Sequence, residues 1–354
     1  MMAQPVPGPP STGSVPLVPA TPESHGGRPA RRRSFRVSAL GGGHGLSSTL
    51  AALRIIAAEH LTAVVTVADD GGSSGRIRQD MDVLPPGDLR MALAALCDDT
   101  EWGRTWAQVM QHRFSSRDGV RGNLDDHAMG NLLIVALWEL IGDPVDGLRW
   151  AGALLGARGQ VLPMSREPLT MSGMVHPPAH EGQQPEPRRV SSQAELARAG
   201  KSGRLTQVQI HPAEAQACTE AVTSIELSDW VVFGPGSWYT SVLPHLLLND
   251  LRSALCETEA RRCIVMNLTS DTAETVGMSP ADHLEVLREY CPELRVDRII
   301  ADPSAVREDE RDAFDAAAAG LGATIAYHRV RKEDDPEVHD PLRLAIALDE
   351  TFEA

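Results

Sequence analysis

Apolar runs of strand length alternate with helical patterns along most of this chain. The run 63–68 reads AVVTVA, and continuous apolar runs of this kind are typical of parallel strands covered on both faces. Similar runs predict strands at 35–40, 230–233, 263–266, 296–301 and 324–330. Apolar residues at helical spacing predict helices at 46–56, 88–97, 128–141, 145–156, 280–290 and 305–321. This alternation predicts an α/β protein, namely a Rossmann-like three-layer αβα sandwich around a mostly parallel, doubly wound sheet.

Residues 165–210 interrupt the alternation. Strands are predicted at 168–171 and 205–210, and the segment 175–189 between them is rich in Pro, His, Gln and Glu. We therefore expect a small β excursion from the main sheet that carries a mobile loop.

The two ends of the chain differ from its centre. Residues 1–33 are rich in Pro, Gly and Ser and predict a disordered tail, because they bury too little apolar surface to offset the entropy of ordering. The rest predicts one nucleotide-binding α/β domain over 34–335 and a C-terminal helix over 336–354.

A glycine-rich turn directly follows the first predicted strand and opens a helix. It reads GGGHG, and its glycines are Gly41, Gly42, Gly43 and Gly45. Glycine permits positive φ and lets a phosphate approach the backbone, while the helix N-terminus offers free N–H groups. The string is neither a Walker A motif nor a complete GxGxxG fingerprint. It predicts a phosphate-binding turn, with a purely structural tight turn as the alternative.

A second turn of this kind follows the strand at 230–233. It reads GPGSWYTS, so that two glycines and three hydroxyl side chains coincide at the start of a helix. The residues predicted to bind phosphate are Gly234, Gly236, Ser237 and Thr240.

An acidic, glycine-rich segment follows the strand at 63–68. Asp69 and Asp70 are adjacent carboxylates, which suit ribose hydroxyls or a divalent cation. The following residues predict an anion-binding nest with a phosphate-pairing arginine. They are Gly71, Gly72, Ser73 and Arg76. A solvated flexible loop is the alternative.

Two further segments add polar groups near the predicted carboxyl edge. Asp88, in the string PPGDLR, is expected to be the N-cap of the next helix or to lie near Asp69 and Asp70. His127 and Asn131 are four residues apart on one face at the start of an otherwise apolar helix, so they predict contacts to a base, a sugar or a phosphate. Helix capping is the alternative for both.

Composition narrows the functional classes. The formal net charge of −15 disfavours nucleic acid and anionic membranes, and no apolar run approaches the length of a membrane helix. We therefore expect no nucleic-acid partner and no membrane insertion. Five scattered cysteines without CxxC spacing predict reduced thiols in a cytoplasmic protein. No metal-spaced His/Cys set and no nucleophile–base pair stands out, so no metal ligand or catalytic residue is assigned.

Taken together, these motifs resemble one family. GGGHGLS at 41–47, VTVADDGGSSGR at 65–76, PPGDLR at 85–90, HAMGNL at 127–132 and GPGSWYTS at 234–241 occur in that family's order. The chain is similar to the YvcK-like gluconeogenesis-factor family of the CofD-like superfamily, over about residues 35–335. The resemblance implies a Rossmann-like fold, a homodimer, binding of UDP-sugars such as UDP-N-acetylglucosamine, and a role in cell shape and cell-wall supply during gluconeogenic growth. Superfamily relatives are 2-phospho-L-lactate transferases that use magnesium held by aspartates, which points to Asp69, Asp70 and Asp88.

The segment 267–283 departs from the family pattern. Family members carry a stretch resembling MTQPGET followed by GY[ST]AxDH, whereas Met278 stands here in place of the tyrosine. The resemblance implies that this tyrosine contacts the nucleotide sugar. Its replacement by Met278 therefore predicts a change in the affinity for UDP-sugars or in the preference for the base.

These observations lead to one main hypothesis and two alternatives. The main one is a cytoplasmic regulator that binds a nucleotide sugar, without an assigned catalytic activity and with an unidentified regulatory protein partner. No cofactor is assigned, although magnesium is compatible with this hypothesis. The second is a phospholactyl-type transferase acting on a guanosine diphosphate donor and a deazaflavin acceptor, and the third is a structural protein whose glycine loops are only turns. Under the main hypothesis, Gly42→Val is expected to abolish binding and leave the fold largely intact.

Overall fold

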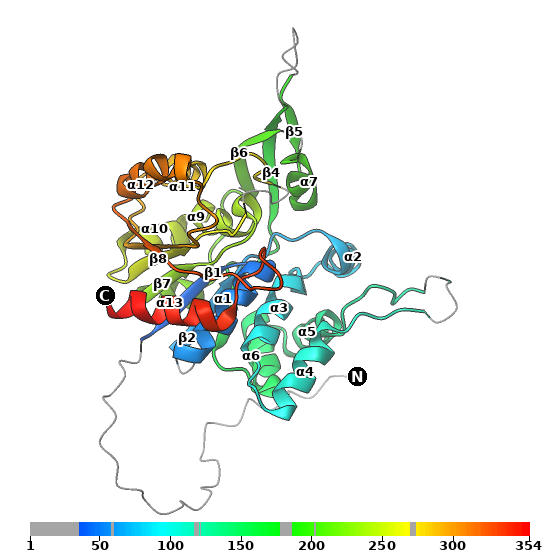
Figure 1. The fold of residues 1–354 in the computed structure, drawn as a ribbon. Helices are drawn as coiled ribbons and strands as arrows, with labels where there is room; N and C mark the ends of the chain where they lie inside the picture. Colours follow the sequence, from blue (N-terminus) through cyan, green and yellow to red (C-terminus); the bar gives the residue numbers. More distant parts are fainter. Residues whose placement is uncertain are drawn as a thin grey trace, which may run out of the picture. The chain divides into compact units, whose positions relative to one another are not determined.

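The main sheet is parallel and has the topology of a doubly wound α/β protein (Figure 1). The computed structural model describes residues 35–57, 60–116, 120, 122–177, 186–201, 203–269 and 274–354. The predicted tail at 1–33 and the middle of the predicted loop at 175–189 lie outside these residues. Within the described part, residues 35–354 form one compact unit.

Seven strands form the sheet in the order β10-β9-β8-β7-β1-β2-β3, and every neighbouring pair is parallel. They are β1 (Val37–Gly41), β2 (Leu61–Val65), β3 (Gln160–Pro163), β7 (Trp230–Phe233), β8 (Arg261–Val265), β9 (Arg298–Ala301) and β10 (Thr324–Tyr327). All residues of β1 and β7 are buried, as their continuous apolar sequences predict. From β1 the chain proceeds to one edge through β2 and β3, and from β7 it proceeds to the other, so the topological switch point lies between β1 and β7.

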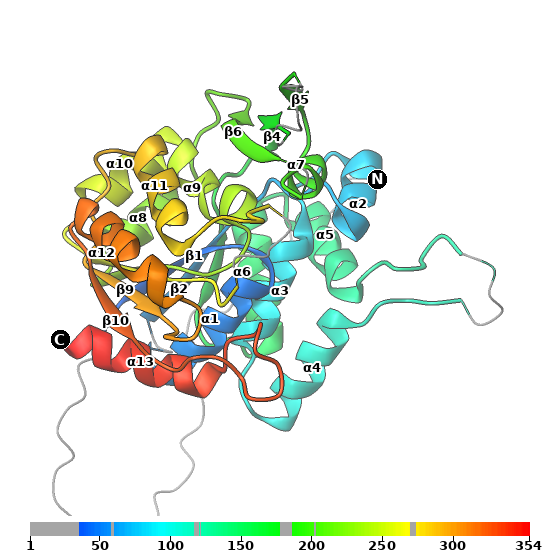
Figure 2. The same cartoon turned by 45° about the horizontal axis from the view of Figure 1, so that its top comes forward.

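Helices flank this sheet (Figures 1 and 2). They are α1 (Gly43–Ala57), α2 (Gly72–Met81), α3 (Pro86–Leu96), α4 (Glu101–Gln111), α5 (Met129–Ile141), α6 (Pro144–Leu155), α7 (Gln193–Ala199), α8 (Thr219–Glu226), α9 (Pro244–Leu247), α10 (Asn249–Glu257), α11 (Pro280–Tyr290), α12 (Arg311–Gly320) and α13 (Pro341–Glu353), with a π-helical turn η2 (Trp238–Val242) and a 3₁₀ turn η3 (Glu308–Glu310). Helix α1 packs against α3 and α13, while α8 packs against α10. The C-terminal helix is fixed by Phe352, whose ring stacks on Trp230 of β7 with centroids 4.7 Å apart. No helix in the described ranges is long and apolar enough to cross a membrane.

The predicted excursion forms a second, antiparallel sheet of three strands. Its strands are β4 (Thr170–His176), β5 (Arg188–Val190) and β6 (Arg204–His211), with β4 in the centre. Helix α7 packs against β4 and β5.

Several predicted boundaries move. Helix α3 begins at Pro86 with Pro85 as its N-cap, so the expectation that Asp88 is the N-cap is wrong. Proline is favoured at the first helical position because its missing N–H would have no intrahelical partner there, and this moves Asp88 into the first turn. The predicted helix at 305–321 begins only at Arg311, after η3. Helix α2, which occupies most of the predicted glycine nest, and helix α4 were not predicted from the sequence.

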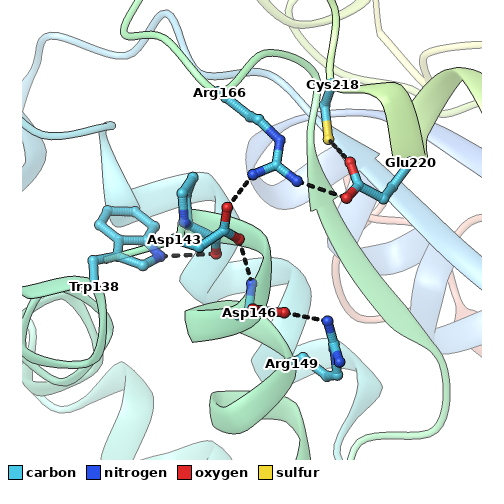
Figure 3. Close-up of polar contacts among 8 residues, drawn as sticks. Trp138, Asp143, Asp146, Arg149, Arg166, Cys218 and Glu220 are labelled. Atoms are coloured by element: carbon cyan, nitrogen blue, oxygen red, sulfur yellow. Dashed lines mark hydrogen bonds and ion pairs between the residues drawn. The ribbon is translucent and has the colours of Figure 1, made fainter. Parts of the chain in front are cut away.

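A network of polar side chains lies at the β3 edge of the sheet. Figure 3 shows the guanidinium of Arg166, which follows β3, between the carboxylates of Asp143 and Glu220. Asp143 is the N-cap of α6 and accepts a hydrogen bond from the backbone N–H of Asp146 at 2.9 Å, while Glu220 lies in the first turn of α8. The network therefore joins the N-termini of two helices to the end of one strand.

Removal of the α6 cap is expected to lower stability more than removal of the ion pairs. Asp143→Ala leaves the N–H of Asp146 without its side-chain acceptor, and we expect it to cost about 1 kcal/mol of unfolding free energy. The control Arg166→Ala removes only the half-exposed ion pairs and should cost less. Urea unfolding of both variants measures the difference, and an Asp143→Ala loss no larger than that of Arg166→Ala would contradict the capping role.

Candidate functional site

The glycine turns after β1 and β7 meet at the topological switch point. A Cβ atom at Gly45 would lie only 1.9 Å from the carbonyl oxygen of Pro235, so this contact permits no side chain. The predicted turns at 41–45 and 234–237 are therefore adjacent in space, at the carboxyl edge where ligands bind in open α/β sheets.

The N-terminus of α1 is bonded to a carboxylate of the chain itself. The backbone N–H of Gly43 donates to Asp88, which is half-buried. The N–H groups of His44 and Gly45 belong to the same first turn, which has no intrahelical acceptors. These two groups are thus the backbone donors that α1 offers to a ligand anion.

The position of Asp88 leaves no room for a side chain at Gly42, whether or not a ligand is bound. A Cβ atom there would lie 2.4 Å from Oδ2 of Asp88 and 2.6 Å from Cγ2 of Thr66. Both neighbours are confined, since Thr66 is buried and Asp88 accepts the Gly43 N–H. We therefore expect Gly42→Val to disturb the fold as well, contrary to the expectation from sequence.

Two half-buried acidic side chains lie beside the α1 turn. Burial and, after it, the neighbouring charge of Asp69 raise the pKa of Asp88 to about 7, against the opposing effects of the Gly43 hydrogen bond and Arg90. Burial also raises the pKa of Asp69, although this carboxylate accepts hydrogen bonds from the Gly71 N–H, at 3.0 Å, and from Ser74. Asp69 and Asp88 are close enough to interact, as the sequence analysis expected, and their shared burial disfavours the doubly charged state.

Asp70 has a different role from its neighbour. Its two carboxylate oxygens accept from the backbone N–H groups of Gln193, at 3.0 Å, and Ala194, at 2.9 Å. These donors form the first turn of α7, so Asp70 ties the small antiparallel sheet to the edge of the main one.

A hydrogen-bonded chain brings together the residues predicted from α2 and α5. The amide of Asn131 donates to Oγ of Ser73 at 3.0 Å, and Nδ1 of His127 lies 3.2 Å from the same oxygen. Nε of Arg90 donates to Oδ1 of Asn131 at 2.9 Å. His127 precedes α5 and is half-buried, whereas Asn131 is buried in the first turn. Arg76 lies apart from this chain and donates to the backbone oxygen of Asp125 at 2.8 Å.

The backbone N–H groups in and after the turn that follows β7 also donate to side chains of the chain itself. The backbone N–H of Gly236 donates to Oδ1 of Asn267 at 2.7 Å. One carboxylate oxygen of Glu274 accepts from the N–H groups of Tyr239 and Thr240, each at 3.2 Å, and the other accepts from the Thr240 hydroxyl. Glu274 is buried, and burial raises its pKa. The donors predicted to bind phosphate at η2 therefore already have an anionic partner, which the sequence analysis missed although Glu274 lies in the segment it singled out.

One cavity adjoins these turns, and a second is lined by Glu274, the partner of η2. The first, of about 160 Å³, lies at the switch point and is lined by residues of the β1 and β7 turns, the segment after β8 and the segment before α13. These include His44, Gly45, Ser48, Gly236 and His339. The second, of about 510 Å³, lies between β6, α11 and the segment 274–278, and Met278 is part of its wall. The altered position noted in the sequence therefore lines a separate cavity.

The raised pKa of Asp88 predicts a pH dependence of stability. Because its pKa rises from 3.8 to about 7 on folding, its contribution is fully present below about pH 4 and is lost as the pH rises through about 7. Asp88→Asn keeps the shape of the side chain and removes this titration. We expect the unfolding free energy of the variant to fall less between pH 4 and 7 than that of the wild type. Urea unfolding in magnesium-free buffer measures both, and identical pH slopes would contradict the assignment.

Comparison with known proteins places the chain in a family. A family model described as 2-phospho-L-lactate transferase CofD matches residues 37–326. A Mycobacterium tuberculosis (strain ATCC 25618 / H37Rv) protein named "Putative gluconeogenesis factor" is 44% identical over 315 residues, which are 88% of this chain and 89% of the relative. A Halalkalibacterium halodurans protein named "Gluconeogenesis factor" is 32% identical over 325 residues, which are 88% and 95% of the two chains.

A solved structure agrees with these matches. The crystal structure of a protein member of the UPF0052 family from Bacillus halodurans aligns with a TM-score of 0.74 and 30% sequence identity, covering 91% of this chain and 99% of that one. The α/β fold predicted from the sequence and the family resemblance are both confirmed. The chain belongs to the CofD family, and within it to the YvcK-like (UPF0052) proteins that carry the name gluconeogenesis factor.

Proposed function

We propose that this chain is a cytoplasmic regulatory protein that binds a nucleotide sugar of the UDP-N-acetylglucosamine type, acts as a homodimer, and serves cell-wall supply and cell shape under gluconeogenic growth. Relatives that span most of the chain are named gluconeogenesis factor. The observation that carries the binding proposal is the cavity at the switch point, next to the first turn of α1.

The backbone of the α1 turn is assigned to the diphosphate. The N–H groups of His44 and Gly45 lie in a first turn without intrahelical acceptors, and both residues line the cavity. The turn after β7 contributes shape, because its N–H groups at Gly236, Tyr239 and Thr240 already donate to side chains. At about 160 Å³ the cavity is smaller than an ordinary ligand pocket, so it receives only part of the ligand.

We assign magnesium, as a cation that accompanies the ligand, to two carboxylates next to the first turn of α1. Asp69 and Asp88 supply two carboxylates. A divalent cation between them would lower the free-energy cost of holding both charges in a partly desolvated place. In the part of the chain that the structure describes, no group of three or more His, Cys, Asp and Glu side chains gathers as a metal site. The cation would therefore complete its shell with phosphate oxygens and water, as magnesium commonly does.

A transferase is the second candidate. The family model that matches the chain is described as a transferase. With a pKa of about 7, Asp88 is present near neutral pH in both its protonated and its charged form. Such a carboxyl group suits proton transfer to or from an acceptor hydroxyl. Magnesium-dependent turnover of a guanosine diphosphate donor would favour this candidate over the regulator.

The binding proposal predicts a selective thermal shift. UDP-N-acetylglucosamine at 100 times its dissociation constant should add about 2.7 kcal/mol of stability, which is a shift of a few degrees for a chain of this size. GDP, NAD and inorganic phosphate, each tested with and without magnesium, should give smaller shifts. Stabilisation by guanosine nucleotides alone would favour the transferase, and no shift with any compound would contradict both.

A matched pair of variants locates the binding. Ser48 lines the cavity from the second turn of α1, whereas its neighbour Ser47 does not. Ser48→Phe should fill the cavity and weaken UDP-N-acetylglucosamine binding at least tenfold, since it occupies the ligand's volume. Ser47→Phe carries the same change in helix propensity and should bind within about twofold of the wild type. Isothermal titration calorimetry measures both, and equal affinities of the two variants would contradict a site in this cavity.

A further inference from the structure

His339 carries a buried ring nitrogen without a hydrogen-bond partner. The side chain is 5% exposed, and its Nε2 atom has no partner among the described residues. The ring makes a hydrogen bond to the backbone of Met266, directly after β8, and since Nε2 has no partner we assign this bond to the other ring nitrogen. Leaving a polar atom buried and unpaired costs free energy, so the position of the atom is informative.

The unpaired histidine is part of the cavity at the switch point. His339 lines that cavity together with His44 and Gly45, the residues whose N–H groups we assign to the diphosphate. A side chain from the C-terminal part of the fold therefore shares one small cavity with the first glycine turn.

The segment that carries His339 is firmly held. Arg331 and His339 form an antiparallel bridge, and the N–H of Lys332 donates to the carbonyl oxygen of Val338 at 2.9 Å. The buried carboxylate of Asp302, after β9, accepts from the backbone N–H groups of Val330, at 2.9 Å, and Arg331, at 3.2 Å. His339 is thus positioned before a ligand arrives, which reduces the ordering cost of binding.

The chemistry of this side chain differs from that of the glycine turn. Burial lowers the pKa of His339 to about 4, so the imidazole is neutral near pH 7 and Nε2 acts only as an acceptor. The carboxylate of Glu337, which also lines the cavity, adds further acceptors. The α1 turn offers N–H donors instead, so the cavity suits an anionic group next to a ring that carries N–H or O–H donors.

We propose that Nε2 of His339 accepts a hydrogen bond from an N–H or O–H group on a ring of the bound nucleotide sugar, which makes His339 a specificity-determining residue of the site. The inference rests on the proposed nucleotide-sugar function and adds a contact from outside the glycine motifs. The group that donates to His339 is either the imide N–H of the base or a hydroxyl of a sugar, and both are hydrogen-bond donors.

Two substitutions separate the two ring nitrogens. His339→Asn keeps a donor near the Met266 contact and removes the acceptor at the Nε2 position. His339→Gln places an amide oxygen near the Nε2 position and so restores an acceptor. We expect Asn to weaken UDP-N-acetylglucosamine binding about three- to tenfold, and Gln to bind within about twofold of the wild type. The thermal midpoint of the ligand-free Asn variant should not fall, because the substitution removes an unpaired buried atom.

His283 supplies a matched control. It is also buried, its Nδ1 lies 2.8 Å from the carbonyl oxygen of Ser279, and its Nε2 has no partner among the described residues. It does not belong to the cavity wall at the switch point. His283→Asn should therefore leave the affinity for UDP-N-acetylglucosamine unchanged.

Calorimetric titration of the full-length variants with UDP-N-acetylglucosamine and with UDP decides the matter. A loss for both ligands places the donor on the base or ribose, and a loss for UDP-N-acetylglucosamine alone places it on the terminal sugar. Normal binding by His339→Asn, or an equal loss in Asn and Gln, overturns the proposal while the nucleotide-sugar function stands. If the wild type binds neither ligand, the function and this inference both fail.

Discussion

The close approach of two glycine turns determines the arrangement of the candidate site. Because a Cβ atom at Gly45 would collide with the backbone of Pro235, the α1 N-terminus and the turn after β7 can meet only without side chains between them. Residues of both turns form part of the wall of the cavity at the switch point, and the segments after β8 and before α13 complete that wall. A side chain at position 45 would push apart the two halves of the doubly wound sheet at the place where a ligand is expected.

Carboxylates of the chain itself occupy the positive ends of the helices at this edge. Asp88 accepts from the first N–H of α1, Glu274 from the N–H groups of η2, and Asp70 from those of α7. These bonds hold three segments that are distant in sequence in one place. They also raise the cost of bringing a phosphate close to Asp88 while that group is charged. A proton or a magnesium ion on the Asp69–Asp88 pair removes that cost, so anion binding and the state of this pair are linked.

The sequence predicted the elements whose signals are local. Continuous apolar runs such as 63–68 marked the buried parallel strands, and the glycine strings marked the strand-to-helix turns that meet at one sheet edge. His127 and Asn131 were predicted to lie on one face at the start of a helix, and both side chains contact Ser73, while their contact to a ligand stays a prediction. These successes share a cause, because each depends on periodicity or on backbone requirements within a few residues.

What the sequence did not reveal depends on contacts between distant segments. Glu274 and His339 have no local pattern that distinguishes them from surface residues, and only the folded chain places one at η2 and the other in the cavity wall. Asp70 was grouped with Asp69 as a ligand-facing pair, yet the two side chains diverge once α7 supplies partners for Asp70. Asp88 was misplaced as a cap because two prolines before it begin the helix earlier.

The most direct test of this account is a crystal structure of the protein with UDP-N-acetylglucosamine. The account predicts phosphate oxygens within hydrogen-bond distance of the backbone N–H groups of His44 or Gly45, at the cavity between the β1 and β7 turns. A ligand bound instead in the larger cavity beside Met278, with the α1 turn empty, would contradict it.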